Sequence, residues 1–266
     1  QKFASEEYFA SQSRSSSRAA TWHPWPVSAR ACVLHSDERF IALAKPPGVS
    51  LATPRREPHA AVMRLLSALS EAERTLHGLD VDTLLLVHRL DVGTSGVVLL
   101  ARTGDVHREL VAAFAAHRVE KTYLALVWGR PRPPSGCFEQ PLGPDRRDRR
   151  RMRIDATGRA ASSAYETLAR GPHVSLLRLT PHTGRTHQLR VHLAGPGHPI
   201  VGDDLYAGPR HRGVRDPALR TAFNPGRPLL HAWSLRLPPG RTTAALTVTA
   251  PLPEDLCVAL AAAAIP

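Results

Sequence analysis

The sequence predicts an α+β fold with a mixed, mostly antiparallel central sheet flanked by helices and loops. Three observations favour this class. The chain has 266 residues and is 42% hydrophobic, which is enough for the core of one large domain or two small ones. Short apolar runs, which are typical of strands, outnumber segments with helical spacing. The two kinds of segment do not alternate regularly, as they would in a doubly wound parallel sheet.

The N-terminal region differs in composition from the rest of the chain. Residues 1–27 are polar and rich in Ser, which predicts a flexible arm or the remnant of a targeting segment. A Pro-flanked stretch at 22–26 separates this arm from the folded part, which we expect to occupy residues 28–266 as one domain.

Residues 40–100 contain one helical segment among strands. Residues 40–44 (FIALA) predict a strand, and Lys-Pro-Pro-Gly at 45–48 predicts a rigid turn. Between 58 and 76, apolar residues recur on one face at helical spacing, which predicts a helix. The short continuous apolar runs at 84–87 and 97–100 predict buried strands.

A second helix and a central strand follow. Apolar residues at helical spacing predict a helix over 105–117, and the run at 121–128 (KTYLALVW) is apolar on both faces, which favours a central strand. Residues 131–153 have the composition of a loop, whereas 163–168 and 174–180 predict strands.

The last quarter of the chain predicts closing strands. Residues 187–194 fit a helix or a strand, and Gly-Pro-Gly at 195–197 ends either one. The runs at 229–237 and 244–249 predict strands, and the Ala-rich end fits a short helix or a frayed terminus.

The charge balance indicates a polyanionic partner. Lys and Arg number 35 against 23 Asp and Glu, giving a net charge of +12. Such basicity favours nucleic acid or an anionic membrane surface, although Arg is also frequent in chains from genomes rich in G and C. No apolar run reaches the roughly 18 residues needed to span a bilayer. The three cysteines are scattered, which disfavours a disulfide framework and a zinc ribbon and favours a reducing compartment.

The segment VHRLDVGTSGVVLL at 87–100 places an acid, Asp91, between two apolar runs. Gly93 and Gly96 allow the backbone to turn sharply, and Thr94 and Ser95 can hydrogen-bond to turn amides. One interpretation is an ordinary turn. The other is an acid placed for chemistry, because each polar group between buried strands has a desolvation cost.

A second polar concentration is TPHTGRTHQLRVH at 180–192, which contains His182, His187, His192, Arg185 and Arg190. A metal site is a weak interpretation. Zinc-binding His pairs are usually closer in sequence and are completed by a thiolate or carboxylate, which this segment lacks. Arg and His together are better suited to phosphate or carboxylate contacts.

A third feature is a run of six arginines within the predicted loop, Arg146, Arg147, Arg149, Arg150, Arg151 and Arg153. It is either a solvated surface segment or a basic finger that contacts an RNA or DNA backbone. The glycine pattern contains neither the P-loop nor the dinucleotide-binding motif, and no Ser-His-Asp arrangement is evident.

Several separated segments occur together in one known family. They are FIALAKPPG at 40–48, HRLD at 88–91 with TSG at 94–96, KTYLA at 121–125, TGRTHQLRVH at 183–192 with PIVGD at 199–203, and LHA at 230–232. In this order they resemble the RluA-type pseudouridine synthases, which modify ribosomal and transfer RNA. The resemblance covers roughly residues 30–250 and implies the pseudouridine synthase fold with a central cleft.

The resemblance also implies roles for single residues. Asp91 matches the catalytic aspartate, Tyr123 the tyrosine beside the target base, and Arg190 the basic residue that pairs with the aspartate. Further substrate-binding residues are implied as follows: Arg89, which helps fill the space left by the extruded base, Leu189 as an apolar wall, Arg185 and His187.

The implied activity is the isomerisation of specific uridines to pseudouridine in structured rRNA or tRNA. The carboxylate would attack C1′ of the sugar or remove a proton from C2′, and the residues do not decide between these routes. No redox step occurs, so we expect no cofactor and no metal. The alternative is a catalytically idle RNA-binding or ribosome-associated protein on the same fold.

The expected partner is therefore a structured RNA stem-loop, and we expect no membrane association. From the short N-terminal stretch we expect a single catalytic domain, without the small RNA-binding domain that some relatives carry ahead of it. We expect a monomer in the cytoplasm, with an organellar matrix as the alternative.

Overall fold

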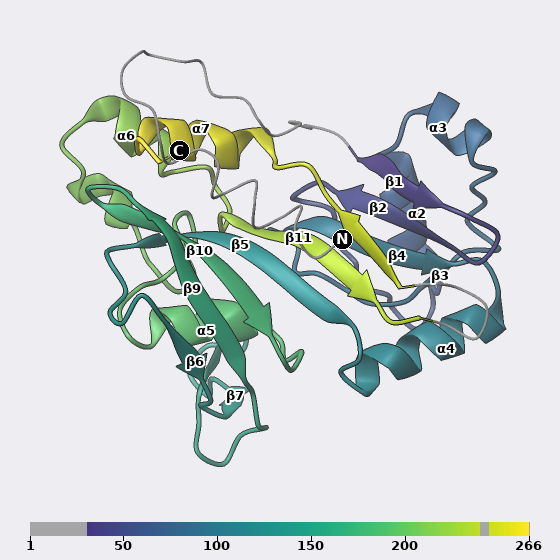
Figure 1. The fold of residues 1–266 in the computed structure, drawn as a ribbon, viewed down its shortest axis with the longest axis horizontal. Helices are drawn as coiled ribbons and strands as arrows, with labels where there is room; N and C mark the ends of the chain where they lie inside the picture. Colours follow the sequence, from purple (N-terminus) through teal and green to yellow (C-terminus); the bar gives the residue numbers. More distant parts are fainter. Residues whose placement is uncertain (1–30, 240–244, 266) are drawn as a thin grey trace.

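The computed structural model describes residues 31–239 and 245–265 (Figure 1). The predicted arm at 1–27 lies outside the described residues, so the expected domain boundary is not tested. The described strands are β1 (Cys32–Ser36), β2 (Phe40–Lys45), β3 (Leu85–Leu86), β4 (Ser95–Ala101), β5 (Glu120–Trp128), β6 (Ser135–Phe138), β7 (Leu142–Pro144), β8 (Met152–Ile154), β9 (Ser163–Arg170), β10 (Val174–Pro181), β11 (Leu230–Leu237) and β12 (Leu246–Thr249). The helices are α2 (Ala60–Ser67), α3 (Glu71–Leu76), α4 (Gly104–Ala115), α5 (Gln188–Ala194), the 3₁₀ turn η1 (Arg210–Gly213), α6 (Pro217–Ala222) and α7 (Glu254–Ala262).

A single large sheet organises the described part of the chain. Its strand order is β1-β2-β4-β11-β5-β10-β9-β6, with β12 on β11 and β3 on β4. The β4–β11 pair is parallel and the other pairs in this sheet are antiparallel. The predicted class, α+β with a mixed and mostly antiparallel sheet, is therefore confirmed.

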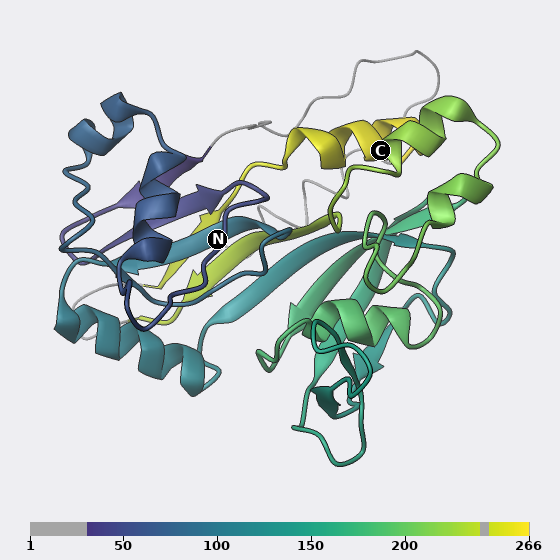
Figure 2. The same cartoon turned by 180° about the vertical axis from the view of Figure 1, so that it is seen from behind.

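Helices cover the two halves of this sheet separately. In Figure 2, α2 lies in front of the β2–β4 half and α5 in front of the β10 half. Apolar side chains of α2 pack on alternate residues of β2 and β4, and α4 covers the opposite face of the same strands. A larger cluster joins β5 and β10 to α5 and α7. Tyr123 on β5 packs against the core under α2 and the core under α5, so it marks the boundary between the halves.

Several predicted elements differ from those observed. The helix expected over 58–76 is broken into α2 and α3, because Ser70 starts a new helix through a capping box with Glu73. The loop expected over 131–153 contains β6 and the small hairpin of β7 and β8, so that prediction was wrong in part. Residues 188–194 form a helix, which settles the ambiguity there.

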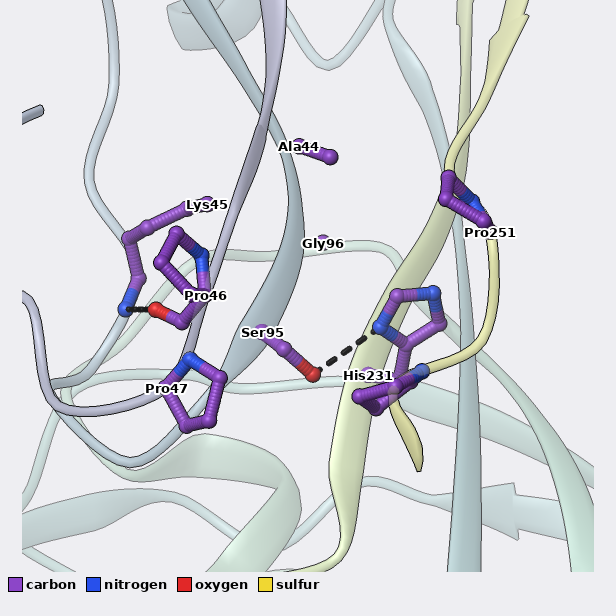
Figure 3. Close-up of a pocket in the computed structure, with 9 residues that line it drawn as sticks. Ala44, Lys45, Pro46, Pro47, Ser95, Gly96, His231 and Pro251 are labelled. Carbon is purple, nitrogen blue, oxygen red and sulfur yellow. Dashed lines mark hydrogen bonds between the residues drawn. The ribbon is translucent and has the colours of Figure 1, made fainter. Parts of the chain in front are cut away.

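The parallel contact between β4 and β11 requires a glycine. Gly96 has φ +118°, and a Cβ there would lie 2.1 Å from the carbonyl oxygen of Ala232. Beside Gly96, the hydroxyl of Ser95 lies 3.0 Å from Nδ1 of His231. A small pocket at this point is lined by Lys45, Pro46, Ser95, Gly96 and His231, among others (Figure 3). Asp91 lies in the segment that immediately precedes β4 and therefore leads into this junction.

The Ser95–His231 pair is structural rather than nucleophilic. Both residues are buried, and burial lowers the pKa of His231 to about 4. The other ring nitrogen of His231 lies 3.5 Å from the carbonyl oxygen of Ala250, so in the described contacts no carboxylate completes a triad.

Candidate active site

A buried lysine, Lys45, makes hydrogen bonds that support the turn containing Asp91. The Nζ of Lys45 donates to the carbonyl oxygens of Pro46 (2.8 Å), Val49 (3.0 Å) and Val92 (3.2 Å). Lys45 is only 1% exposed. Burial, followed by the charge of Arg227, lowers the pKa of Lys45 to about 8, against the opposing influence of Asp91. The Lys-Pro-Pro-Gly turn therefore supports the backbone of the Asp91 turn directly.

A buried arginine holds the same turn from the C-terminal region. Arg227 donates from Nη1 to the carbonyl oxygen of Gly93 at 3.0 Å. Its Nε and Nη2 each lie 2.6 Å from a carboxylate oxygen of Asp255 at the start of α7. A Cβ at Gly93 would lie 2.8 Å from a ring carbon of Pro228, so the turn and this segment are in close contact.

Arg190 on α5 lies between two carboxylates. Its Nε and Nη2 form a bidentate pair with Asp203, at 2.7 Å each, and its Nη1 lies 3.6 Å from Oδ2 of Asp91. The Asp203 side chain is 1% exposed, whereas the Asp91 side chain is 25% exposed. Burial alone would lower the pKa of Arg190, but the hydrogen bonds and charge of Asp203, and then Asp91, raise it. The fixed guanidinium thus faces an Asp91 carboxylate that remains open to solvent.

His187 approaches the same carboxylate from the N-terminal end of α5. Its Nε2 lies 3.9 Å from Oδ2 of Asp91, and its Nδ1 lies 2.9 Å from the hydroxyl of Tyr206. His187 adopts φ +55°, in the left-handed region, at the N-cap of the helix. Burial lowers its pKa, with Arg190 acting in the same direction and Asp91 opposing, so the ring is neutral at pH 7.

The buried amide of Gln188 fixes the loop before α5. Its Oε1 accepts from the hydroxyl of Thr183 at 2.7 Å and from the backbone N–H of Arg185 at 2.9 Å. Its Nε2 donates to the carbonyl oxygen of Ser162 and to the hydroxyl of Ser163. All of its polar positions are used locally, which explains a glutamine in the motif and gives it a structural role.

Tyr123 reaches the site from the central strand β5. Burial raises the pKa of its phenol, and the charge of Asp91 raises it further, so the hydroxyl keeps its proton at neutral pH. Tyr123 can therefore offer a flat apolar face and a donor, but it is a poor base in this environment.

The remaining predicted binding residues lie at different depths. Arg89 is exposed, and its positive charge contributes to lowering the pKa of His187. Leu189 is 6% exposed and packs in the core, so it forms a supporting wall rather than an open one. Arg185 donates from Nε to the carbonyl oxygen of Ala160, and no contact is found between it and Asp91 among the described residues.

The six arginines lie on the hairpin of β7 and β8 and its connecting turn, here called the arginine hairpin (residues 142–154). Arg150 pairs with Asp148 and Arg153 with Asp155. Arg151 is half-buried, with its guanidinium 5.2 Å from the ring centroid of Tyr206. The other five arginines are exposed. Among the described contacts, Arg151 is therefore the one of the six that is tied to the site.

The histidine series does not gather into a metal centre. His192 is buried and bonds Ser163 and the carbonyl oxygen of Gln140, while His182 is exposed. Within residues 31–239 and 245–265, no three His, Cys, Asp or Glu side chains are grouped so as to hold a metal ion. Over the same ranges, the helices are too short or too polar to cross a bilayer.

Two residues in the site, Asp203 and Tyr206, were not predicted as functional. The Pro-Ile-Val-Gly-Asp segment was recognised as a motif, but nothing in it indicated that its acid would bind Arg190. The one available signal was the position of the acid Asp203 directly after an apolar segment, since a charge that becomes buried there needs a partner.

Comparisons with known proteins agree with this architecture. A family model described as RNA pseudouridylate synthase matches residues 39–195. An uncharacterized RNA pseudouridine synthase of Chloroflexus aurantiacus is 44% identical over 175 residues, which cover 66% of this chain and 52% of that protein. The dual-specificity RNA pseudouridine synthase RluA of Escherichia coli K12 is 35% identical over 195 residues, covering 72% of this chain and 81% of that protein.

A solved structure leads to the same family. Human RNA pseudouridylate synthase domain containing 4 superimposes with a TM-score of 0.66 at 26% identity, covering 86% of this chain and 91% of that chain. The chain therefore belongs to the RNA pseudouridylate synthase family, whose members are isomerases that act on RNA. The family predicted from the motifs is confirmed.

Proposed function

We propose that this protein converts specific uridines in structured rRNA or tRNA to pseudouridine, with Asp91 as the catalytic residue. The observation that carries the proposal is the meeting of Asp91 with Arg190 and His187, which come from segments about a hundred residues apart in the chain. A quarter of the Asp91 side chain is exposed, so a nucleotide taken out of its stack can reach the carboxylate.

In this proposal each side chain has a distinct task. Asp91 acts on the sugar, either at C1′ or at the C2′ proton, while the N1–C1′ bond breaks and a C1′–C5 bond forms. C5 then loses its proton, N1 gains one, and the Asp91 carboxylate is regenerated. Arg190, fixed by Asp203, holds the carboxylate in position. Tyr123 supplies a flat face for the freed uracil, and Arg89 enters the space that the base has left. Leu189 supports this wall from the core, and Arg185 and His187 line the approach.

We further propose that exposed arginines of the arginine hairpin contact the RNA backbone. Ion pairs partly neutralise Arg150 and Arg153, and Arg151 packs on Tyr206. The exposed Arg146, Arg147 and Arg149 are the ones available for phosphate. Asp91, Arg190, His187 and Tyr123 all come from one chain, which supports a monomer. A cytoplasmic location is supported by the bacterial origin of relatives such as the Escherichia coli protein.

The decisive experiment replaces Asp91 by Asn, which preserves shape and removes the carboxylate. Pseudouridine maps of total RNA are compared between cells with the intact gene and cells carrying D91N. Sites that disappear identify the substrate, and purified D91N should keep its RNA affinity. An unchanged map, with normal expression of the variant, would instead favour the idle RNA-binding alternative.

A further inference from the structure

The hydroxyl of Tyr206 has one fixed donor, a backbone N–H, and one imidazole nitrogen around it. It lies 2.8 Å from the backbone N–H of Met152, which donates to it, and 2.9 Å from Nδ1 of His187. The phenol's single hydrogen is then directed to Nδ1. If Nδ1 carried a hydrogen instead, the phenol hydrogen would have no acceptor among the described residues. The geometry therefore assigns the ring hydrogen of neutral His187 to Nε2.

The ring of Tyr206 is held on several sides. The guanidinium carbon of Arg190 lies 5.0 Å from its centroid and that of Arg151 lies 5.2 Å away. The ring meets the imidazole of His187 edge-on, with centroids 5.7 Å apart and an interplanar angle of 88°. Two of the contacts, from Arg151 and Met152, come from the arginine hairpin. Tyr206 thus joins that hairpin to the imidazole that faces Asp91.

The charges that act on His187 come from α5, from the loop after α5, and from residues 89–91 before β4. Asp91 from the turn before β4 and Asp203 from the loop after α5 favour a protonated ring. Arg190 on α5 and Arg89 before the Asp91 turn disfavour it, and burial disfavours it most. A neutral ring with hydrogen on Nε2 presents a donor to Asp91. The other tautomer would present a lone pair to a carboxylate, which is repulsive.

We propose that Tyr206 is a positioning residue that holds His187 as the neutral Nε2–H tautomer, so that one N–H is aimed at Oδ2 of Asp91. The backbone of the arginine hairpin keeps the hydroxyl in place. The catalytic consequence rests on the proposed function, whereas the tautomer itself does not.

The first test needs no RNA. In protein labelled with ¹⁵N-histidine, long-range proton–nitrogen spectra at pH 7 report which ring nitrogen carries hydrogen, and H187Q assigns the signal. We expect hydrogen on Nε2 alone in the wild type and a mixture of tautomers or a protonated ring in Y206F. Y165F is the matched control, because in the described contacts the Tyr165 hydroxyl donates to the carbonyl oxygen of Pro133 and not to a residue of the site. Hydrogen on Nδ1 in the wild type, or an unchanged signal in Y206F, would overturn the proposal.

The second test measures turnover on total RNA from cells that lack the gene. We expect Y206F to lower kcat by about tenfold or more, with half-saturation unchanged within about twofold, because positioning is lost and binding is kept. Its activity should also begin to fall at a higher pH on acidification than that of the wild type. Y165F should match the wild type. If the wild type has no activity, the proposed function is contradicted, and the tautomer measurement alone decides the role of Tyr206. If Y206F and the wild type have equal rates, the positioning role is contradicted.

Discussion

Arg190 illustrates how one residue serves structure and site together. Its two bonds to Asp203 are sealed from water, while its Nη1 faces the exposed carboxylate of Asp91. Removing the guanidinium would leave the charge of Asp203 buried without its main partner. An activity loss in R190A must therefore be separated from a loss of folding, although we expect turnover to disappear and RNA affinity to be largely kept in the folded fraction.

For R190A we expect the free energy of unfolding to fall by about 3–5 kcal/mol, because breaking a buried pair leaves an uncompensated charge. The double variant R190A/D203N removes that charge and should recover at least about 1 kcal/mol. Urea unfolding of the wild type, R190A, D203N and the double variant gives the coupling. Simple addition of the two single losses would show that the pair does not matter for folding.

Lys45 predicts a dependence of stability on pH. Burial lowers its pKa from 10.5 to about 8, so between these values the unfolded chain holds a proton that the folded chain has released. The contribution of Lys45 to the free energy of unfolding therefore rises with pH across that window, by an amount on the order of 3 kcal/mol. This contribution is lowest below pH 8. In K45M this contribution is absent. The difference in unfolding free energy between wild type and K45M should rise between pH 8 and 10.5; a constant difference would contradict the shift.

At the scale of elements, the regular segments were predictable and the short ones were not. Runs such as those of β4 and β5 are apolar on both faces, so their burial could be read from the sequence. The break between α2 and α3 had a local signal, Ser70 followed by Glu73, which apolar spacing alone overlooks. The hairpin of β7 and β8 lacks any such signal, because its strands have only three residues each and show no run of apolar or β-branched residues.

The residues of the candidate site were also predictable only in part. Asp91, Arg190 and Tyr123 lie in motifs whose residue types match a known chemistry, so their proximity could be predicted. The partners of those residues could not. Asp203 and Tyr206 reach Arg190 and His187 only because the chain after α5 folds back over the helix, and no sequence spacing encodes that return.

The arginine hairpin yields a prediction for RNA binding. We expect R146Q/R147Q/R149Q to weaken binding of bulk transfer RNA at low salt by about tenfold or more. The slope of log K against log salt should also fall by about 2, since each lost phosphate contact removes about 0.7–0.9. The matched control, R55Q/R118Q/R170Q, removes the same charge from exposed positions elsewhere. Equal losses in both variants would mean that only the overall charge matters.

At the scale of the whole molecule, the C-terminal third completes the centre of the fold. β11 lies between β4 and β5, as Figure 1 shows, and it is the strand through which the two halves of the sheet are joined. Arg227 and Asp255 link α7 to the Asp91 turn. The region that matches the family model, 39–195, thus contains the predicted catalytic residues but not the strand that brings their supporting halves together.

This arrangement predicts which part of the chain folds alone. A fragment of residues 28–266 should unfold in urea with the same midpoint and cooperativity as the full chain, as expected for one domain. A fragment of residues 28–195 should show no cooperative transition and little near-UV circular dichroism. Without β11 the facing edges of β4 and β5 lack their backbone partner, and the core shared with α7 stays exposed to water. A cooperative transition in 28–195 would mean that the matched region is an independent domain. A lower midpoint in 28–266 would instead assign a stabilising role to the first 27 residues.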